Sequence, residues 1–224
     1  MMEPYYKDDF VTLYNADCRE VLGQLEPVDL VLTDPPYGID FVSGRSGQQG
    51  KSRIVNDQDV SLRDEVLLQA RYRGAFVFGS PRIEKPKGWK VCLIWHKGDH
   101  VGMGNLTLPW KPNFEEIYVL GEGFKGQRTS SVVHFLAIAG TVSSVKGRIG
   151  RMHPTEKPLD LLRYLIGKTD AVTILDPFAG SGTTLVAAKQ LGLKAIGVEI
   201  EEKYCRIAVE RLRQNSLIPL MEAA

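Results

Sequence analysis

The chain has 224 residues, 43% of them hydrophobic and 25% charged, which is the composition of a soluble globular protein with one sizeable core. No apolar run approaches the roughly 20 residues of a membrane span, and three widely spaced cysteines exclude a disulfide framework and fit a reducing cytoplasm. The net charge of +1 neither favours nor excludes a nucleic-acid partner, and His96 and His100 are expected to be loop histidines, so no metal site is predicted.

Seven short apolar runs are typical of strands, and helical patterns separate several of them. In chain order the strands are expected at Phe10–Asn15, Val28–Thr33, Gly74–Gly79, Lys90–Trp95, Glu115–Leu120, Val172–Leu175 and Lys194–Val198. The helices are expected at Cys18–Leu25, Ser61–Arg73, Leu159–Lys168, Ser181–Leu191 and Glu201–Asn215. This alternation predicts an α/β fold with one doubly wound, mostly parallel sheet that forms a single domain over residues 1–224.

Two polar segments interrupt this pattern. Residues 38–59 contain four glycines and three serines and predict a mobile loop. Residues 121–152 are also rich in glycine and serine and predict a small insert. No acid occurs between Gly123 and Thr155, and the basic residues there are Lys125, Arg128, Lys146, Arg148 and Arg151. Such a stretch suits a surface that faces phosphates, although a solvated loop with a chance imbalance is the alternative.

The segment Thr33–Gly38 reads TDPPYG and directly follows an apolar strand. Pro35 and Pro36 have no backbone N–H and fix φ, so the strand must end there. The resulting stiff elbow would hold the Asp34 carboxylate, the Pro35 carbonyl and the Tyr37 ring in fixed relative positions. Taken alone, the motif could also be an ordinary turn at the end of a strand.

Four acids follow predicted strands, namely Asp17, Asp34, Asp176 and Glu199. Ligands of open α/β sheets bind beyond those strand ends, although a single acid there could instead be a helix N-cap.

The segment Asp176–Thr184 reads DPFAGSGTT, and its glycines allow the backbone to approach a ligand closely. Glu199, 17 residues after Gly182, could accept hydrogen bonds from a ribose diol. Leu185 stands where a dinucleotide fingerprint has its third glycine, and Asp176 would repel a pyrophosphate. The pattern therefore favours S-adenosylmethionine, whose ammonium group suits Asp176, over NAD.

Together TDPPYG, HPTEKP (residues 153–158) and DPFAGSGTT resemble the motifs of the amino-group DNA methyltransferases. Their order in the chain resembles the permuted beta class of that family. The resemblance implies a seven-stranded Rossmann-like sheet, S-adenosylmethionine as cofactor, and a catalytic tetrad formed by Asp34, Pro35, Pro36 and Tyr37. It implies that the cofactor is bound by Asp17, Cys18, Thr155, Lys157, Pro158, Asp176, Phe178, Ala179, Gly180, Ser181, Gly182, Thr183 and Glu199.

Within that set, the resemblance assigns the adenine of the cofactor to Asp17 and Cys18, and the ribose to Glu199. It places Thr155, Lys157 and Pro158 near the methionine carboxylate. It also implies a target-recognition region, for which only residues 121–152 are available.

The expected activity is therefore methyl transfer to N6 of adenine in duplex DNA, with the target base flipped out, as in restriction-modification systems. Asp34 and the Pro35 carbonyl would each accept one amino hydrogen, and Tyr37 would stack on the base. Asp in the first tetrad position favours adenine, whereas Ser is usual in cytosine N4 methylases. Methylation of cytosine N4 or of RNA is the alternative, an NAD-binding oxidoreductase is a weaker one, and a homodimer is left open.

Overall fold

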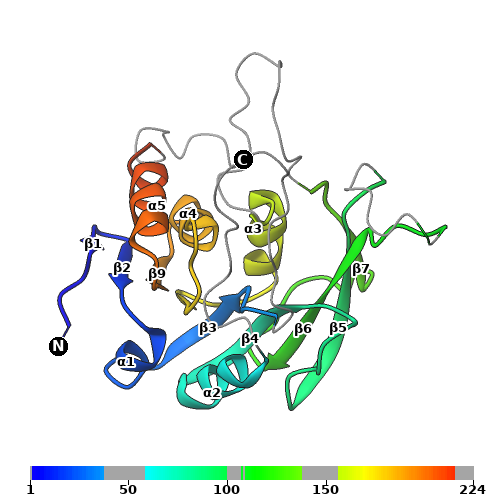
Figure 1. The fold of residues 1–224 in the computed structure, drawn as a ribbon, viewed down its shortest axis with the longest axis horizontal. Helices are drawn as coiled ribbons and strands as arrows, with labels where there is room; N and C mark the ends of the chain where they lie inside the picture. The colour runs from blue at the N-terminus through cyan, green and yellow to red at the C-terminus, as the bar shows by residue number, and fades with distance from the viewer. Residues whose placement is uncertain (1, 38–58, 100–106, 108, 138–155, 215–224) are drawn as a thin grey trace.

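A computed structural model describes residues 2–37, 59–99, 107, 109–137 and 156–214 (Figure 1). Within these residues nine strands form one sheet in the order β1-β2-β9-β8-β3-β4-β6-β5-β7. The strands are β1 (Tyr6–Lys7), β2 (Val11–Asn15), β3 (Val28–Thr33), β4 (Tyr72–Gly79), β5 (Trp89–His96), β6 (Phe114–Gly121), β7 (Val132–His134), β8 (Thr173–Asp176) and β9 (Lys194–Glu199). The helices are α1 (Cys18–Leu22), α2 (Ser61–Gln69), α3 (Leu159–Gly167), α4 (Thr183–Gln190) and α5 (Glu202–Gln214).

The predicted fold class is confirmed, and every predicted strand and helix is present, with the bounds of Val28–Thr33 as predicted and one or both ends of each other element shifted. The predicted number of seven strands is too low, because β1 and β7 also join the sheet. These two strands have only two and three residues, too few to give a recognisable apolar pattern. The helix expected at Ser61–Arg73 is also too long, since α2 ends at Gln69 and β4 begins at Tyr72.

Strand direction decides which residues meet at each edge of the sheet. The neighbours β2, β9, β8, β3 and β4 are parallel, so their carboxyl ends lie along one edge. Strand β6 runs antiparallel to both β4 and β5. The amino end of β6, with Phe114 and Glu115, therefore lies at the same edge as the carboxyl ends of its neighbours. Ligand sites of open α/β sheets form at this edge.

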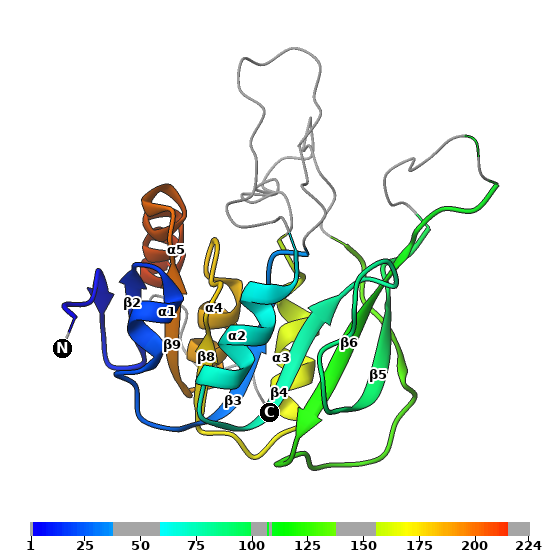
Figure 2. The same cartoon turned by 60° about the horizontal axis from the view of Figure 1, so that its bottom comes forward.

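Helices cover both faces of the sheet (Figures 1 and 2). One hydrophobic cluster joins the strands to α3, α4 and α5, which lie above the sheet in Figure 1. It includes Leu165 of α3, Leu185 of α4 and Leu212 of α5, all fully buried. A second cluster joins the other face to α1 and α2 through Val21 and Val66. Burial of each such side chain contributes about 1.5–3 kcal/mol, so this two-sided packing holds the strand ends in place.

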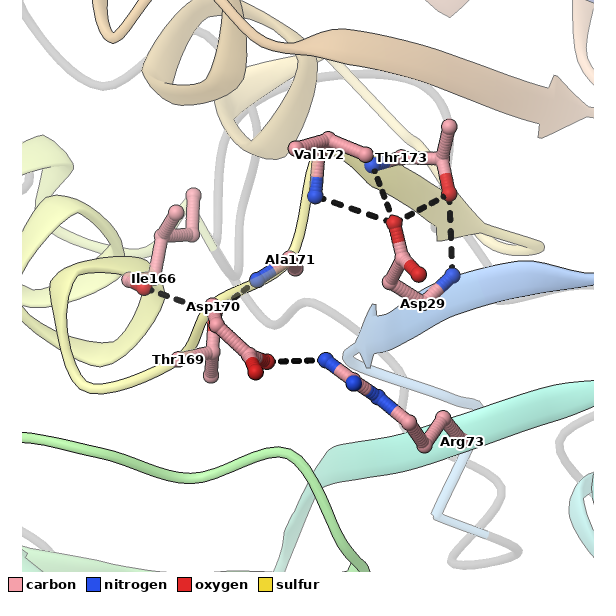
Figure 3. A network of polar contacts seen from close by, with 8 residues as sticks. All are labelled: Asp29, Arg73, Ile166, Thr169, Asp170, Ala171, Val172 and Thr173. Atoms are coloured by element: carbon pink, nitrogen blue, oxygen red, sulfur yellow. Dashed lines mark hydrogen bonds and ion pairs between the residues drawn. The ribbon is translucent and has the colours of Figure 1, made fainter.

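The amino ends of β3 and β8 are held by a polar network (Figure 3). Oδ2 of Asp29 accepts hydrogen bonds from the backbone N–H groups of Val172 and Thr173 and from the Thr173 hydroxyl, at 3.0, 2.9 and 2.8 Å. The bond from Val172 N–H is the largest factor that lowers the pKa of Asp29. Arg73 at the start of β4 pairs with Asp170 just before β8. This network fixes the register of three strands at the edge opposite the predicted site.

The predicted insert at 121–152 is described only as far as residue 137, and this part packs into the fold. Phe124 contacts Phe76 with ring centroids 5.3 Å apart, and β7 extends the sheet beside β5. Target recognition by residues 121–152 stays a prediction. The predicted mobile loop at 38–59 lies outside the described residues except for Asp59. Across the described residues, no helix has the length and apolar character needed to cross a membrane.

Candidate active site

The TDPPYG elbow leaves β3 at the edge where the parallel strands end. Tyr37 folds back, and its hydroxyl donates to Oδ1 of Asp34 at 2.7 Å. The other carboxylate oxygen, Oδ2, accepts from the Lys157 ammonium at 2.6 Å. Pro35 is buried, whereas the Asp34 side chain keeps 21% of its surface accessible. The elbow therefore presents the Asp34 carboxylate at the edge of the sheet, with Tyr37 and Lys157 as its partners.

Lys157 contacts protein carboxylates, which the family resemblance does not imply. Its ammonium lies 2.6 Å from the carboxylate of Asp34 and 3.2 Å from that of Glu115. The side chain is only 7% exposed, and it lies over the rings of Phe78 and Tyr37 at 4.9 and 5.8 Å. The resemblance places Lys157 beside the methionine carboxylate of a cofactor. In this structure its charge is balanced by Asp34 and Glu115, because burial disfavours an ammonium without a counterion. Contact of Lys157 with a cofactor carboxylate stays a prediction.

Glu115 is a site residue that the sequence reasoning missed. Its carboxylate bridges two lysines, with Oε1 2.5 Å from Lys97 Nζ and Oε2 3.2 Å from Lys157 Nζ. Oε2 also lies 3.4 Å from the Tyr37 hydroxyl. No motif marks this glutamate, and its position follows only from the antiparallel direction of β6. Lys97, Glu115, Lys157 and Asp34 form a chain of alternating charges, called the charge chain below.

Burial and neighbouring charges shift the pKa values within the charge chain. Burial raises the pKa of Asp34, Lys157 opposes that shift, and the negative charge of Glu115 reinforces it. Burial would also raise the pKa of Glu115, but Lys157 and Lys97 outweigh burial and lower it. Burial would lower the pKa of Lys157, yet Asp34 and Glu115 together raise it. At neutral pH Lys157 and Glu115 are therefore charged.

The second motif, DPFAGSGTT, forms a tight turn between β8 and α4. Gly180 and Gly182 have φ of +50° and +78°, a region that L side chains rarely adopt. A Cβ on Gly182 would lie 2.7 Å from the Cβ of Ala208 in α5, so no larger residue fits there. Helix α4 begins at Thr183, two residues later than predicted, because these glycines make the turn first. Ser181 and Thr183 are buried, and Ala179 packs in the core.

Asp176 is buried at the end of β8. Its Oδ1 accepts from the Thr33 hydroxyl at 2.9 Å and from Phe178 N–H at 3.2 Å. Burial raises the pKa of Asp176 to about 6, despite hydrogen bonds from Thr184, Thr33 and Phe178 that lower it. No described basic side chain forms an ion pair with this carboxylate. A buried carboxylate of this kind is suited to an ammonium group supplied by a ligand.

Glu199 ends β9 beside the glycine turn, as predicted. Its two carboxylate oxygens accept from Gly180 N–H at 2.8 Å and from Glu201 N–H at 2.7 Å. Burial raises its pKa, and these two backbone hydrogen bonds oppose that rise. Each carboxylate oxygen has a second lone pair, so the fixed carboxylate can still accept hydrogen bonds from a diol. Asp176, Gly180 and Glu199 thus fit the ammonium and ribose groups of S-adenosylmethionine.

A second missed feature is a partly buried ion pair behind the glycine turn. Arg211 of α5 donates to the Ser181 carbonyl, the Ser181 hydroxyl and the Thr183 hydroxyl at 2.9, 3.0 and 3.0 Å. Its guanidinium also pairs with Glu156 at 2.9 Å. Burial lowers the pKa of Arg211, and Glu156 opposes that shift. Glu156 belongs to the HPTEKP segment, so Arg211 ties this segment to the glycine turn.

The strand β2 brings Asp17 and Cys18 to the same edge of the sheet, because Asn15 of β2 pairs with Glu199 of β9. The Asp17 carboxylate caps α1 through Arg19 N–H at 3.0 Å and also pairs with the Arg19 guanidinium, which lowers its pKa. Cys18 is buried, and burial raises the pKa of its thiol to about 12. Contact of these two residues with a cofactor adenine stays a prediction. Phe178 is partly buried against the second hydrophobic cluster, and Pro158 is the N-cap of α3.

The predicted basic surface is not brought to this edge as far as the structure describes it. Lys125 N–H donates to the Lys168 carbonyl at 2.7 Å, next to the start of β8. Lys125 therefore lies near the amino ends of the parallel strands, opposite Asp34, and Arg128 follows in the same segment. Nucleic-acid binding by this segment stays a prediction. The other predicted residues, Thr155, Lys146, Arg148 and Arg151, lie outside the described residues.

Solved structures with the same fold support this description of the sheet. The M1.HpyAVI complex with S-adenosylmethionine matches with a TM-score of 0.63 at 21% identity, covering 90% of this chain and 99% of the other. The PvuII DNA methyltransferase, described as cytosine-N4-specific, matches with a TM-score of 0.65 at 16% identity, covering 93% of this chain and 88% of the other. Both likenesses show the Rossmann-like methyltransferase fold.

Sequence relatives extend over nearly the whole chain. The Type II methyltransferase M2.LlaDCHI of Lactococcus lactis subsp. cremoris is 27% identical over 262 residues, covering 96% of this chain and 94% of the relative. The putative methylase YubD of Escherichia coli (strain K12) is 29% identical over 218 residues, covering 88% of each chain. The 262-residue alignment exceeds the 224 residues of this chain, so that relative carries segments that are absent here.

A family model described as DNA methylase, N6_N4_Mtase, matches residues 82–210. This match covers more than half of the chain and includes the glycine turn, Glu199, Glu115 and Lys157. It removes the alternative of an NAD-binding oxidoreductase. The chain belongs to this family of S-adenosylmethionine-dependent amino-group DNA methyltransferases.

Proposed function

We propose that this chain methylates the exocyclic N6 amino group of adenine in DNA. The observation that carries the proposal is the proximity of two carboxylates, Asp34 after β3 and Asp176 at the end of β8. The two strands are parallel neighbours, and the Thr33 hydroxyl, one residue before Asp34, donates to Asp176 at 2.9 Å. The negative charge of Asp34 also contributes to the raised pKa of Asp176. An acceptor for the target base therefore lies beside a binding group for the cofactor ammonium.

The reaction requires the amino nitrogen to become a better nucleophile, since its lone pair is delocalised into the base. The Asp34 carboxylate and the Pro35 carbonyl would each accept one amino hydrogen, which favours tetrahedral geometry at nitrogen. When bound, S-adenosylmethionine supplies an electrophilic methyl group on a sulfonium. Acceptors fixed in advance are commonly worth ~2.7–4 kcal/mol each, because they need no reorganisation in the transition state.

The elbow suits this role because its prolines restrict motion. A misplacement of about 1 Å can cost on the order of 100-fold in rate, and the proline pair limits such displacement. Asp34 acts as a hydrogen-bond acceptor and need not remove a proton before methyl transfer, because the amino group becomes acidic only once it is methylated.

Duplex DNA must present the adenine outside the helix, because the amino group is paired inside it. Tyr37 would offer its ring for stacking on the extruded base, which contributes roughly 1–3 kcal/mol per base. For that its hydroxyl would leave Oδ1 of Asp34, where it donates in this structure. Asp in the first tetrad position supports adenine over cytosine as the target.

The test is to incubate the protein with S-adenosylmethionine carrying a tritiated methyl group and with duplex DNA, single-stranded DNA or RNA. The product is digested and the labelled nucleoside identified. We expect label in N6-methyladenine from duplex DNA. Label in N4-methylcytosine, or in RNA alone, would replace the proposed substrate, and no label in any substrate would refute the proposed activity.

A second experiment identifies the DNA sequence in which the protein methylates adenine. DNA from cells that express the chain would be compared with DNA from cells that express Asp34→Ala, with modified bases mapped along the genome. We expect methylated adenines in a repeated sequence context that is absent from the control. Scattered methylation at equal levels in both samples would contradict site-specific modification.

A further inference from the structure

The charge chain poses a problem that the proposed reaction must solve. Both oxygens of Asp34 already accept hydrogen bonds, Oδ1 from the Tyr37 hydroxyl at 2.7 Å and Oδ2 from the Lys157 ammonium at 2.6 Å. A target amino group needs one of these oxygens as an acceptor. Departure of the Tyr37 hydroxyl frees Oδ1, but the Lys157 ammonium on Oδ2 still draws negative charge from the carboxylate and makes it a weaker acceptor. Loosening of the Lys157 contact would strengthen this acceptor, although a buried ammonium without a counterion is strongly disfavoured.

We propose that Glu115 is a positioning residue that receives the Lys157 ammonium when the target amino group engages Asp34. This inference rests on the proposed function and adds a second carboxylate to it. Glu115 Oε2 lies 3.2 Å from Lys157 Nζ, so the ammonium transfers between the two carboxylates by a shift on the order of 1 Å. No proton moves and no covalent bond forms or breaks in this step.

The electrostatics of the charge chain favour such a shift. Two carboxylates and two ammonium groups give no net charge before or after it. Lys97 Nζ lies 2.5 Å from Glu115 Oε1, the carboxylate oxygen that does not face Lys157, and so fixes the position of this glutamate. The Phe78 ring, 4.9 Å from Lys157 Nζ, also provides a face that attracts the cation and does not depend on Tyr37. The Lys157 ammonium therefore keeps a negatively charged partner throughout the shift from Asp34 to Glu115.

The first experiment compares Glu115→Gln with the wild type. Glutamine has nearly the same shape but no charge, so Lys157 has only Asp34 as an ionised partner and competes with the amino group. We expect kcat for DNA methylation to fall roughly 10- to 100-fold, while the KM for S-adenosylmethionine stays within about twofold. Unchanged kcat in an active preparation would overturn the inference and leave the proposed function intact.

Glu116→Gln is the matched control. Glu116 is the next residue of β6, is buried, and accepts a hydrogen bond from the Tyr118 hydroxyl on the opposite face of the sheet. We expect kcat within about twofold of the wild type for this variant. An equal fall in both variants would assign the effect to general damage of β6 and would overturn the inference.

A double-mutant cycle separates positioning from direct contact with the base. If Glu115 acts through Lys157, then Glu115→Gln lowers kcat in the wild-type background but by less than about twofold in a Lys157→Met background. A full and additive loss in the Lys157→Met background would mean that Glu115 acts on the substrate without Lys157.

The final measurement needs neither DNA nor catalysis. The Asp34 carboxyl carbon is followed by ¹³C NMR as a function of pH, assigned with Asp34→Asn. The ionisable groups around it are Lys157, Glu115, Tyr37 and Asp176, with Lys97 beyond Glu115. The repulsion from Glu115 raises the pKa of Asp34, so in Glu115→Gln we expect the resonance to titrate at lower pH. Identical titrations in both proteins would overturn the inference, whatever the activity.

Discussion

Asp176→Asn tests the binding role of the buried carboxylate, because the substitution should stabilise the protein while it weakens cofactor binding. Burial raises the pKa of Asp176 from 3.8 to about 6. A carboxyl whose pKa is higher in the folded state opposes folding when it is ionised. That penalty is absent below pH 3.8, grows between pH 3.8 and about 6, and is complete above it.

The magnitude follows from the pKa shift of about 2 pH units, which corresponds to about 3 kcal/mol. Asn removes the charge and keeps one oxygen. This oxygen can accept the two hydrogen bonds that Oδ1 accepts in the native protein, from the Thr33 hydroxyl and from Phe178 N–H. At pH 8 we therefore expect a gain of up to ~3 kcal/mol, or about 6–12 °C in Tm for a chain of this length. The gain should fall steadily below pH 6.

The assay is thermal unfolding of both proteins between pH 5 and pH 8, combined with calorimetric titration of S-adenosylmethionine at pH 8. Loss of the charged contact to the ammonium should weaken binding roughly 10- to 100-fold. Asp170→Asn is the control, since its half-exposed carboxylate pairs with Arg73 at the opposite edge and should change stability by no more than about 1 kcal/mol. A lower Tm for Asp176→Asn at pH 8, or unchanged cofactor affinity, would refute the reasoning.

Three further substitutions test other parts of the site. Asp34→Ala should lower kcat for methyl transfer by at least about 100-fold, since a fixed acceptor contributes ~2.7–4 kcal/mol, and should keep cofactor affinity within about threefold; loss of cofactor binding with normal transfer at saturation would contradict its role. Glu199→Ala should have the opposite effect: binding of S-adenosylmethionine should weaken by about 10-fold or more in a calorimetric titration, and methyl transfer should be restored at high cofactor concentration. Arg211→Met should lower the free energy of unfolding by about 1–3 kcal/mol in denaturant titrations, because it removes the ion pair with Glu156 and three hydrogen bonds to the glycine turn. The double variant Arg211→Met/Glu156→Gln should recover part of that loss, and a fully additive loss would argue against coupling of the two side chains.

Local patterns of residues were enough to predict the elements and the turns of this protein. Alternating apolar runs and helical patterns predicted the five helices and seven of the nine strands that the described residues form, because burial periodicity is a local property of the chain. Prolines and glycines fixed the TDPPYG elbow and the DPFAGSGTT turn in the same way, since each restricts or frees its own φ angle. The acids Asp34, Asp176 and Glu199 are therefore recognisable from the sequence alone, because each stands where an apolar run stops.

The contacts of these side chains depend on how distant segments come together in the fold. The direction of β6 cannot be predicted from the sequence. Because β6 runs antiparallel to β4, Glu115 lies at the edge of the sheet where Asp34 and Lys157 lie. The family resemblance assigns Lys157 to a cofactor carboxylate, which stays a prediction. The ion pairs of Lys157 with Asp34 and Glu115 could not be predicted, because these partners stand 123 and 42 positions away in the chain. Sequence reasoning assigns Lys125 to a DNA-facing surface, yet the path of its segment puts Lys125 near the amino ends of the strands. Ion pairs between distant segments depend on sheet order and packing, and no local pattern of residues encodes them.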